Sequence, residues 1–247
     1  MNASKHAGLV LIPAYDAGGL LEGTVREALA QWQPVWVVDD GSTDGSVARL
    51  AESFAGESRP RVIALPENRG KGAALRAGAQ RALREGYTHA LTMDADGQHD
   101  AASIPRFMEA SRANPDALIM GSPLFSKDAP WSRVWGRKLN IFWTDLETGF
   151  CGLGDTLFGF RVYPLGPLCR VMEQMSWGRG FDFDPEVAVR LRWEGLRPRQ
   201  LETPVRYIPS DSGGISHFHY LRDNALLTWL HFRLLPECIL RKTRLFR

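Results

Sequence analysis

Short apolar runs alternate with helical patterns along the first hundred residues. The apolar runs predict strands at Leu9–Tyr15, Val35–Asp39, Arg61–Leu65 and His89–Met93, and the patterns between them predict helices at Leu20–Trp32, Ser46–Phe54 and Lys71–Arg84. Strands that alternate with helices of this length are typical of βαβ units, in which the strands pair in parallel. We therefore expect an α/β fold, doubly wound around a mostly parallel sheet.

The pattern loosens after Ala101. It predicts strands at Leu118–Met120 and Thr156–Tyr163, helical stretches at Trp131–Leu146 and Pro185–Trp193, and a turn-rich link marked by Gly149, Gly152 and Gly154. No linker, low-complexity segment or repeat separates independent domains. We expect one Rossmann-like domain over residues 1–215, with halves at 1–100 and 101–215, followed by a C-terminal segment at 216–247.

The C-terminal segment is both apolar and basic. A helix is predicted at Tyr220–Leu235 and is expected to end at Pro236. Its apolar residues occupy nearly the whole circumference, so it requires burial in protein or lipid. From His217 onward six basic residues face two acidic ones, a balance of +4 within a total of +2. This combination predicts contact with an anionic membrane surface, with packing on protein as the alternative.

The composition is that of a soluble globular chain. Of 247 residues, 44% are hydrophobic and 23% charged, which excludes disordered, collagen-like and disulfide-scaffold proteins. The small net charge gives no field directed at nucleic acid. Cys151, Cys169 and Cys238 lack metal or disulfide spacing and indicate a reducing compartment. A membrane-spanning helix needs about 18 consecutive apolar residues, and no run in this sequence is that long. We therefore expect a cytoplasmic protein that is peripheral at the cytoplasmic face of the membrane.

A carboxylate pair follows the last strand of the first half. Asp94 and Asp96 would point the same way if the strand continued through them, and Gln98 adds an amide oxygen to the set. Such oxygen ligands suit Mg²⁺ or Mn²⁺, which complete their shells with phosphates and water. The alternative for an isolated pair of this kind is a solvated turn or a helix cap.

Two further polar clusters follow strands or open a helix. Asp39 and Asp40 precede a glycine turn, where carboxylates can hold a ribose or a base edge, or where the residues simply turn and cap. Asn68–Gly72 opens the next helix with small residues and cations, which favour phosphate, although it lacks the Walker and dinucleotide-binding glycine patterns. Ligands of open α/β sheets bind at the carboxyl ends of the strands, where these clusters meet.

Four motifs in order carry a family resemblance. They are Ile12–Asp16, Val37–Gly45, Asn68–Leu75 and Met93–His99. Together they resemble family-two glycosyltransferases with the GT-A fold. Asp155–Tyr163 and Phe181–Glu186 extend the resemblance to the branch that transfers mannose or glucose to polyprenyl or dolichyl phosphate. The resemblance covers Leu9 to Tyr207 and implies a nucleotide-sugar half at residues 1–100 and an acceptor half at residues 101–215, the acceptor half being matched less specifically.

The resemblance implies a role for each matching residue. The nucleoside is bordered by Pro13, Tyr15, Asp16, Asp39 and Asp40, with Lys71 nearby and Asp94 at the nucleotide. Asp94, Asp96 and Gln98 hold the divalent ion that bridges the donor diphosphate. Ser216 and His217 stand where the family often has a Ser-Lys pair that closes over the diphosphate. Departures at Asp16–Ala17 and Gly97 leave the base and the sugar unassigned.

The family reaction sets the requirements on the acceptor side. Inverting transfer needs a cation at the leaving diphosphate and an acceptor oxygen held in line. A lipid phosphate needs no strong base, whereas a hydroxyl needs a carboxylate, for which Asp184 and Asp155 lead and Glu186 follows. Each of these carboxylates is equally suited to capping or to pairing with an arginine. The cations predicted to meet the acceptor are Arg133, Arg137, Lys138 and Arg161.

Several functions therefore compete. The leading one is metal-dependent sugar transfer from a nucleotide sugar to polyprenyl phosphate, and its closest rival is transfer to a lipid or glycan hydroxyl. A sugar-phosphate nucleotidyltransferase is disfavoured because Pro13-Ala14-Tyr15 replaces the glycine-rich loop of that class. A non-catalytic nucleotide-sugar or lipid-binding module is disfavoured by the intact Asp94 and Asp96.

Overall fold

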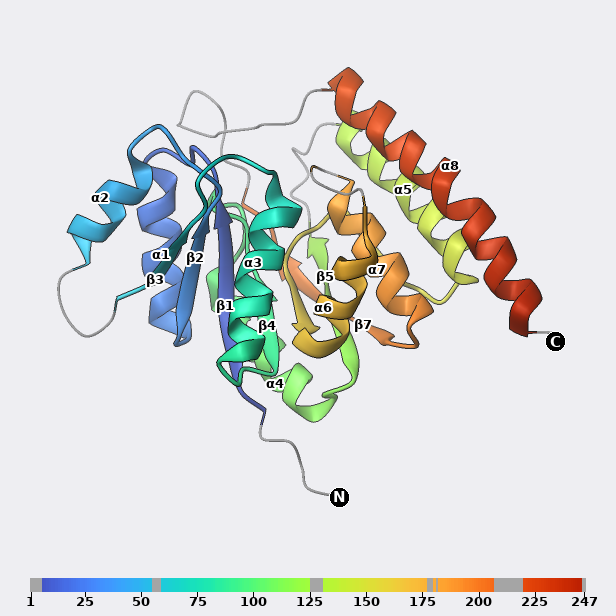
Figure 1. Cartoon of the computed structure of the whole chain (residues 1–247), viewed down its shortest axis with the longest axis horizontal. Coiled ribbons are helices and arrows are strands. Elements are labelled where there is room, and N and C mark those ends of the chain that lie inside the picture. The colour runs from blue at the N-terminus through green and yellow to red at the C-terminus, as the bar shows by residue number, and fades with distance from the viewer. Residues whose placement is uncertain are drawn as a thin grey trace.

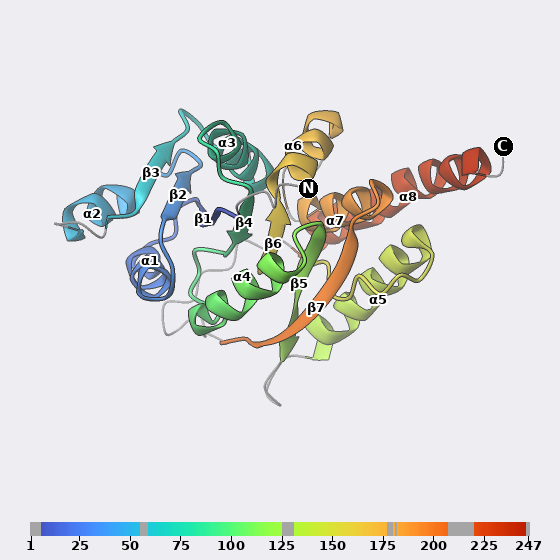
Figure 2. The same ribbon diagram turned by 90° about the horizontal axis from the view of Figure 1, so that it is seen from below.

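The computed structural model describes residues 6–54, 59–124, 131–176, 180, 182–206 and 220–245. A seven-stranded sheet runs through it in the order β3-β2-β1-β4-β6-β5-β7. The strands are β1 (Gly8–Ala14), β2 (Val35–Asp39), β3 (Arg61–Ala64), β4 (His89–Thr92), β5 (Ala117–Leu124), β6 (Arg161–Pro164) and β7 (Arg197–Pro204). The helices, which flank both faces (Figures 1 and 2), are α1 (Leu20–Gln31), α2 (Ser46–Ser53), α3 (Lys71–Arg84), α4 (Ile104–Ala113), α5 (Trp131–Thr148), α6 (Leu165–Gln174), α7 (Phe183–Trp193) and α8 (Tyr220–Leu245).

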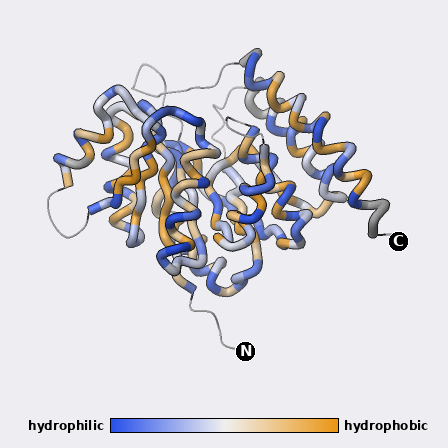
Figure 3. Tube along the Cα trace, viewed as in Figure 1, coloured by the Kyte–Doolittle hydropathy of each residue, from blue (hydrophilic) through white to orange (hydrophobic). Residues whose placement is uncertain are grey.

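The first half has the predicted parallel arrangement. β1 pairs in parallel with β2 and β4, and β2 pairs in parallel with β3. Every residue of β2 and β4 is buried, as expected for parallel strands covered on both faces. Hydrophobic residues accordingly follow the central strands in Figure 3. The alternation of strands and helices in the sequence was sufficient to predict this half.

Side chains that alternate along the strands divide the core into two layers. Leu9 and Leu11 of β1 face the layer that contains α3 and α6, whereas Val10 and Ile12 face the layer of α1 and α4. Gly78 of α3 allows close packing on the sheet, because a Cβ there would lie 2.8 Å from Cγ2 of Val38. This packing fixes α3, and with it the residues at its first turn.

The second half differs from the prediction in several elements. The strand expected at Thr156–Tyr163 begins only at Arg161, because the buried Arg161 guanidinium binds the carbonyls of Thr156 and Phe158 and takes them out of strand pairing. β6 is antiparallel to β4 and β5. The elements α4, α6 and β7 were not predicted. The sequence of β7 is polar, and most of its residues are at least partly exposed. β7 nevertheless pairs with β5 over eight positions.

The C-terminal helix is longer than predicted. Pro236 does not end it, because α8 continues to Leu245 with Pro236 on its exposed side. A proline inside a helix removes one hydrogen bond, and the buried Leu234 and Cys238 on either side offset that cost. One face of α8 packs on α5. Among the described residues, no helix is both long enough and apolar enough to cross a membrane.

We predict that Gly121→Ala destabilises the fold. A Cβ at Gly121 of β5 would lie 2.7 Å from the carbonyl oxygen of Phe160, a backbone atom that cannot move aside cheaply. We expect a loss of about 1–3 kcal/mol in the free energy of unfolding, measured by denaturant titration. Gly23→Ala on α1 is the matched control, since nothing lies within 4 Å of its Cβ. Equal stability of the two variants would contradict this account of the β5–β6 contact.

Candidate active site

The carboxyl ends of β1, β2 and β4 meet at one edge of the sheet, the upper edge in Figure 1. The loops that follow β1 and β2 are hydrogen-bonded to one another. The amide of Asp16 donates to Oγ of Ser42 at 3.1 Å, and the amide of Gly18 donates to Oδ2 of Asp44 at 2.8 Å. These loops form the part of the edge predicted to border a nucleoside.

Three of the carboxylates predicted to bind the nucleoside accept hydrogen bonds from loop amides. Asp16 Oδ1 accepts from the amides of Thr43 and Asp44, at 2.7 and 3.2 Å, with Asp16 itself at a φ of 44°. Asp39 Oδ1 accepts from the amide of Ser42 at 2.9 Å.

Asp40 organises the start of α3. Its two oxygens accept from the amides of Arg69 (3.0 Å) and Gly70 (2.7 Å), and burial raises the pKa of its carboxyl. Asp40 therefore shapes the loop in front of α3. Nucleoside contact by Asp39, by the buried Pro13 and by the partly exposed Tyr15 stays a prediction.

Lys71, the first residue of α3, lies between two carboxylates. Its Nζ is 2.7 Å from Oδ1 of Asp94 and 2.6 Å from Oδ2 of Asp184. Gly159 borders the same group, because a Cβ there would lie 2.8 Å from Nζ of Lys71 and 3.0 Å from Oδ2 of Asp94. One ammonium thus joins the end of β4 to the first turn of α7.

Both partners of the Lys71–Asp94 pair are charged. Burial alone would lower the pKa of Lys71, but the charges of Asp184 and Asp94 outweigh burial and raise it. Burial also opposes ionisation of Asp94, yet Lys71 and then His99 hold the pKa of that carboxyl at about 2. The pKa of Asp96 is raised, chiefly by burial and then by the charge of Asp94. Asp94 is therefore ionised and paired with Lys71, whereas burial and the charge of Asp94 oppose the ionisation of Asp96.

The segment after β4 turns rather than continuing as a strand. β4 ends at Thr92, so Asp94 and Asp96 do not lie on one extended strand. Asp96 Oδ1 accepts from the amide of Gln98 at 3.0 Å. His99, which the sequence pattern does not indicate as a site residue, lies beside Asp94. Its buried Nδ1 accepts from the amide of Asp94 at 3.0 Å, and its Nε2 lies 3.6 Å from Oδ2 of Asp94.

Arg161 is fully buried and holds the segment around Asp184. Its guanidinium donates to the carbonyl of Asp184 at 2.8 Å and to the hydroxyl of Tyr163 at 3.1 Å, and it also binds Thr156 and Phe158. Direct contact of Arg161 with the acceptor, which the sequence predicted, does not fit this burial. Arg161 instead positions Asp184, whose Oδ1 lies 3.8 Å from its Nη1.

The remaining predicted residues do not all converge. Asp155 is buried and accepts a hydrogen bond from Arg137, whereas Glu186 is buried behind the site against Arg190 and Arg233. Lys138 is exposed on α5. The side chain of Arg133, and Ser216 and His217 altogether, lie outside the described residues.

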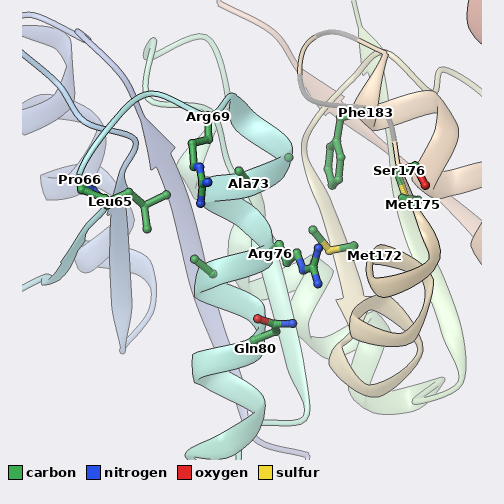
Figure 4. Close-up of a pocket in the computed structure, with 12 residues that line it drawn as sticks. Leu65, Pro66, Arg69, Ala73, Arg76, Gln80, Met172, Met175, Ser176 and Phe183 are labelled. Carbon is green, nitrogen blue, oxygen red and sulfur yellow. The ribbon is translucent and has the colours of Figure 1, made fainter.

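A groove of about 490 Å³ lies beside this edge, between α3 and α6 (Figure 4). Arg69 and Arg76 line it from the α3 side, and Met172, Met175 and Phe183 line it from α6 and the start of α7. None of the predicted catalytic or metal-binding carboxylates lines this groove. It is thus distinct from the polar edge.

Comparison with known proteins identifies the family. The model of glycosyl transferase family 2 matches residues 9–163, more than half of the chain. The chain belongs to glycosyl transferase family 2. The match contains the loops after β1 and β2, the Lys71–Asp94 pair and Arg161, and it ends within β6. The protein is therefore a glycosyltransferase, and the nucleotidyltransferase alternative is wrong.

Named relatives cover most of this glycosyltransferase. It is 30% identical over 213 residues to polyprenol monophosphomannose synthase of Mycolicibacterium smegmatis, with 83% of this chain and 78% of the relative covered. It is 28% identical over 212 residues to undecaprenyl-phosphate mannosyltransferase of Micrococcus luteus, with 83% and 85% covered.

Solved structures share the fold. Glucosyl-3-phosphoglycerate synthase of Mycobacterium tuberculosis, in complex with Mn²⁺, UDP and glucosyl-3-phosphoglycerate, aligns with a TM-score of 0.66 at 16% identity. The alignment covers 95% of this chain and 80% of that chain. This likeness confirms the expected GT-A fold.

Asp94 and Asp96 are the residues of this glycosyltransferase that could hold a divalent cation. Among the described residues no three His, Cys, Asp or Glu side chains are arranged to hold a metal ion. Asp94 and Asp96 nevertheless supply two carboxylates in the turn after β4, one of which pairs with Lys71. Two carboxylates with ligands from substrate phosphates are a common arrangement for Mg²⁺.

We predict that Gly159→Ala abolishes most activity while sparing the fold. The added methyl group would meet the flexible ends of Lys71 and Asp94, so the chain still folds but the ammonium is displaced. We expect kcat for sugar transfer to fall about a hundredfold, the cost of a misplacement near 1 Å. Gly166→Ala is the control, because the nearest atom to its Cβ is Nη1 of Arg170 at 3.7 Å. A wild-type kcat for Gly159→Ala, with unchanged Tm in both variants, would show that the Lys71 ammonium does not need the room left by the missing Cβ of Gly159.

Proposed function

We propose that the protein is an inverting glycosyltransferase that moves a sugar from a nucleotide sugar to polyprenyl phosphate with Mg²⁺ or Mn²⁺. The observation that carries the acceptor class is the pairing of every carboxylate predicted as a base. Asp184 is paired with Lys71, Asp155 with Arg137, and Glu186 with Arg190 and Arg233. Because each of these carboxylates already pairs with a lysine or an arginine, an acceptor that is already anionic and needs no base suits the site better than a hydroxyl.

The names of the relatives support the same acceptor class. The relatives from M. smegmatis and M. luteus are named for polyprenol and undecaprenyl-phosphate substrates, and both align over 83% of this chain. A relative from Trichomonas vaginalis, 26% identical over 247 residues, is named dolichyl-phosphate beta-glucosyltransferase. These names differ in the sugar and agree on a polyisoprenoid phosphate, so the proposal leaves the sugar open.

On the donor side, the loops after β1 and β2 would receive the nucleoside, with Pro13, Tyr15 and Asp39 at its border. Asp94 and Asp96, with Gln98 as the third predicted oxygen ligand, would hold the cation. When bound there, the cation neutralises charge that develops on the leaving diphosphate. Lys71 places a second positive charge beside Asp94, and Asp184 orients the Lys71 ammonium. Ser216 and His217 stay predicted contacts of the diphosphate.

We predict that donor hydrolysis depends on a divalent cation through Asp96. Asp96→Ala removes one of two carboxylate ligands, so slow hydrolysis of nucleotide sugars with Mn²⁺ should fall at least a hundredfold while Tm changes by only a few degrees. Asp116→Ala is the control, because Asp116 precedes β5 at the opposite edge of the sheet. The assay uses a panel of UDP- and GDP-sugars, first without acceptor and then with undecaprenyl phosphate.

Three outcomes of that assay separate the functions. Transfer to undecaprenyl phosphate supports the proposal, and transfer only to hydroxyl acceptors would replace it by the rival acceptor class. Binding of nucleotide sugars without hydrolysis or transfer would indicate a non-catalytic module. Full activity in excess chelator would overturn the cation requirement.

The outer side of α8 supports attachment to a membrane surface. Trp229, Phe232, Ile239 and Leu240 recur at helical spacing and are exposed, Phe232 by 68%. The opposite side packs inward through Leu227, Leu230, Leu234 and Cys238. This arrangement accounts for a helix that is apolar nearly all round, since one side is covered by protein. We propose that the outer side lies on an anionic membrane, at its cytoplasmic face, where basic residues of the segment add attraction.

We predict that the protein binds anionic liposomes through this outer side. Trp229→Ser combined with Phe232→Ser should lower the partition coefficient at least tenfold, because each large apolar side chain contributes about 1.5–3 kcal/mol on burial. Replacing Arg241, Lys242, Arg244 and Arg247 by Ser should weaken binding most at low salt. Leu83→Ser on α3 is the control for an exposed apolar residue elsewhere. If the wild-type protein stays in the supernatant at low salt, membrane attachment is wrong.

A further inference from the structure

A chain of buried polar contacts runs from α8 to the active site. Nε2 of His231 donates to Oδ1 of Asn140 on α5 at 3.2 Å, and Nδ2 of Asn140 donates to Oγ1 of Thr156 at 2.7 Å. The carbonyl of Thr156 accepts from Arg161, which in turn donates to the carbonyl of Asp184. All five residues are buried. The chain therefore links a helix at the edge of the molecule to a carboxylate that holds Lys71.

A second link joins α8 to the same turn of α7. Arg233 donates to Oε2 of Glu186 at 3.2 Å, while Oε1 of Glu186 accepts from Arg190 at 2.9 Å. Glu186 is fully buried and lies two residues after Asp184. Glu186, expected to be a candidate base, thus receives the attachment of α8 instead.

Packing alone does not require these polar contacts. Leu227, Leu230, Leu234 and Cys238 already give α8 a buried apolar face. Buried polar groups are costly unless every partner is present, and replacing them by apolar residues is often neutral or stabilising. What they add is a fixed arrangement of side chains, because a rotamer change at one member leaves its neighbour unpaired.

The end of the chain has little other support. Oδ1 of Asp184 is buried and has no hydrogen-bond partner among the described residues, so only the 3.8 Å approach of Arg161 faces it. Asp184 is thus held at its backbone by Arg161 and on its other oxygen by Lys71. A shift of the first turn of α7 or of the Thr156 loop would therefore move the ammonium.

We infer that His231 and Arg233 of α8 are positioning residues for Asp184, acting through Asn140, Thr156 and Arg161 and through Glu186. The inference rests on the proposed function and deepens it. The helix proposed to lie on the membrane then sets the geometry of the group that faces the donor diphosphate. The consequence is that changes on α8 alter the rate of the chemical step rather than donor affinity.

The test compares His231→Phe and Arg233→Met with Arg112→Met in the full chain. Phe keeps an aromatic ring beside Trp143 but removes both hydrogen-bonding nitrogens, one of which contacts Asn140 and the other the buried Glu147. Arg112→Met removes the same charge as Arg233→Met from an exposed position on α4, outside the C-terminal segment. All variants are assayed well below their Tm, with active sites counted by nucleotide binding.

We expect kcat for transfer to undecaprenyl phosphate to fall about tenfold in His231→Phe and in Arg233→Met, with donor KM and liposome binding unchanged. The double variant should lose less than the product of the two effects, because both act on Asp184. Arg112→Met should match the wild type. A merely structural role would instead lower Tm and the number of active sites while leaving kcat per active site unchanged, and that result would overturn the inference.

A readout that needs no substrate separates this inference from the proposed function. Hydrogen–deuterium exchange of peptides covering Asp182–Glu186 should quicken in His231→Phe and Arg233→Met and stay unchanged in Arg112→Met. If the wild-type protein transfers nothing to undecaprenyl phosphate, the proposed acceptor is wrong, and the exchange rates still decide the positioning role. Unchanged exchange in all three variants would refute it.

Discussion

One ammonium group joins three segments that are far apart in the chain. Lys71 opens α3, Asp94 follows β4, and Asp184 lies 113 residues beyond Lys71 in the first turn of α7. Asp94 and Asp184 each lie within 2.7 Å of the Lys71 ammonium. Two carboxylates this close to one another would repel strongly in a partly buried site, and the positive charge between them removes that cost. The rest of the site is arranged around this group. Gly159 leaves room for it, His99 steadies Asp94, and Arg161 holds the backbone of Asp184.

The same pairing of carboxylates with cations extends to the other predicted bases of the site. Asp155 and Glu186 are each committed to arginines on α5, α7 or α8. The acidic residues near the site thus pair with basic residues of neighbouring helices. Such a site matches an acceptor that brings its own negative charge.

The sequence predicts the first half well because local pattern and tertiary structure agree there. Buried strands such as β2 read as uninterrupted apolar runs, and the helices between them follow the helical period. β7 was missed because its sequence is polar, and its place in the sheet depends on pairing with β5 rather than on its own pattern. The prediction that the helix ends at Pro236 was wrong for a similar reason. The buried residues on either side of Pro236 keep the chain helical although proline disfavours a helix interior. His99 was missed because only the turn after β4 brings its ring back to Asp94.

The position of β6 has a consequence for modularity. The first half of the chain ends at β4, and the chain then forms β5 before β6 returns to pair with the free edge of β4. A fragment that stops after the carboxylate pair would therefore expose an open strand edge, the kind of surface that pairs with other copies and aggregates. The two halves of the chain are therefore not separate folding units. Exchange of second halves between relatives would need to carry β6 and its Arg161 contacts as one piece.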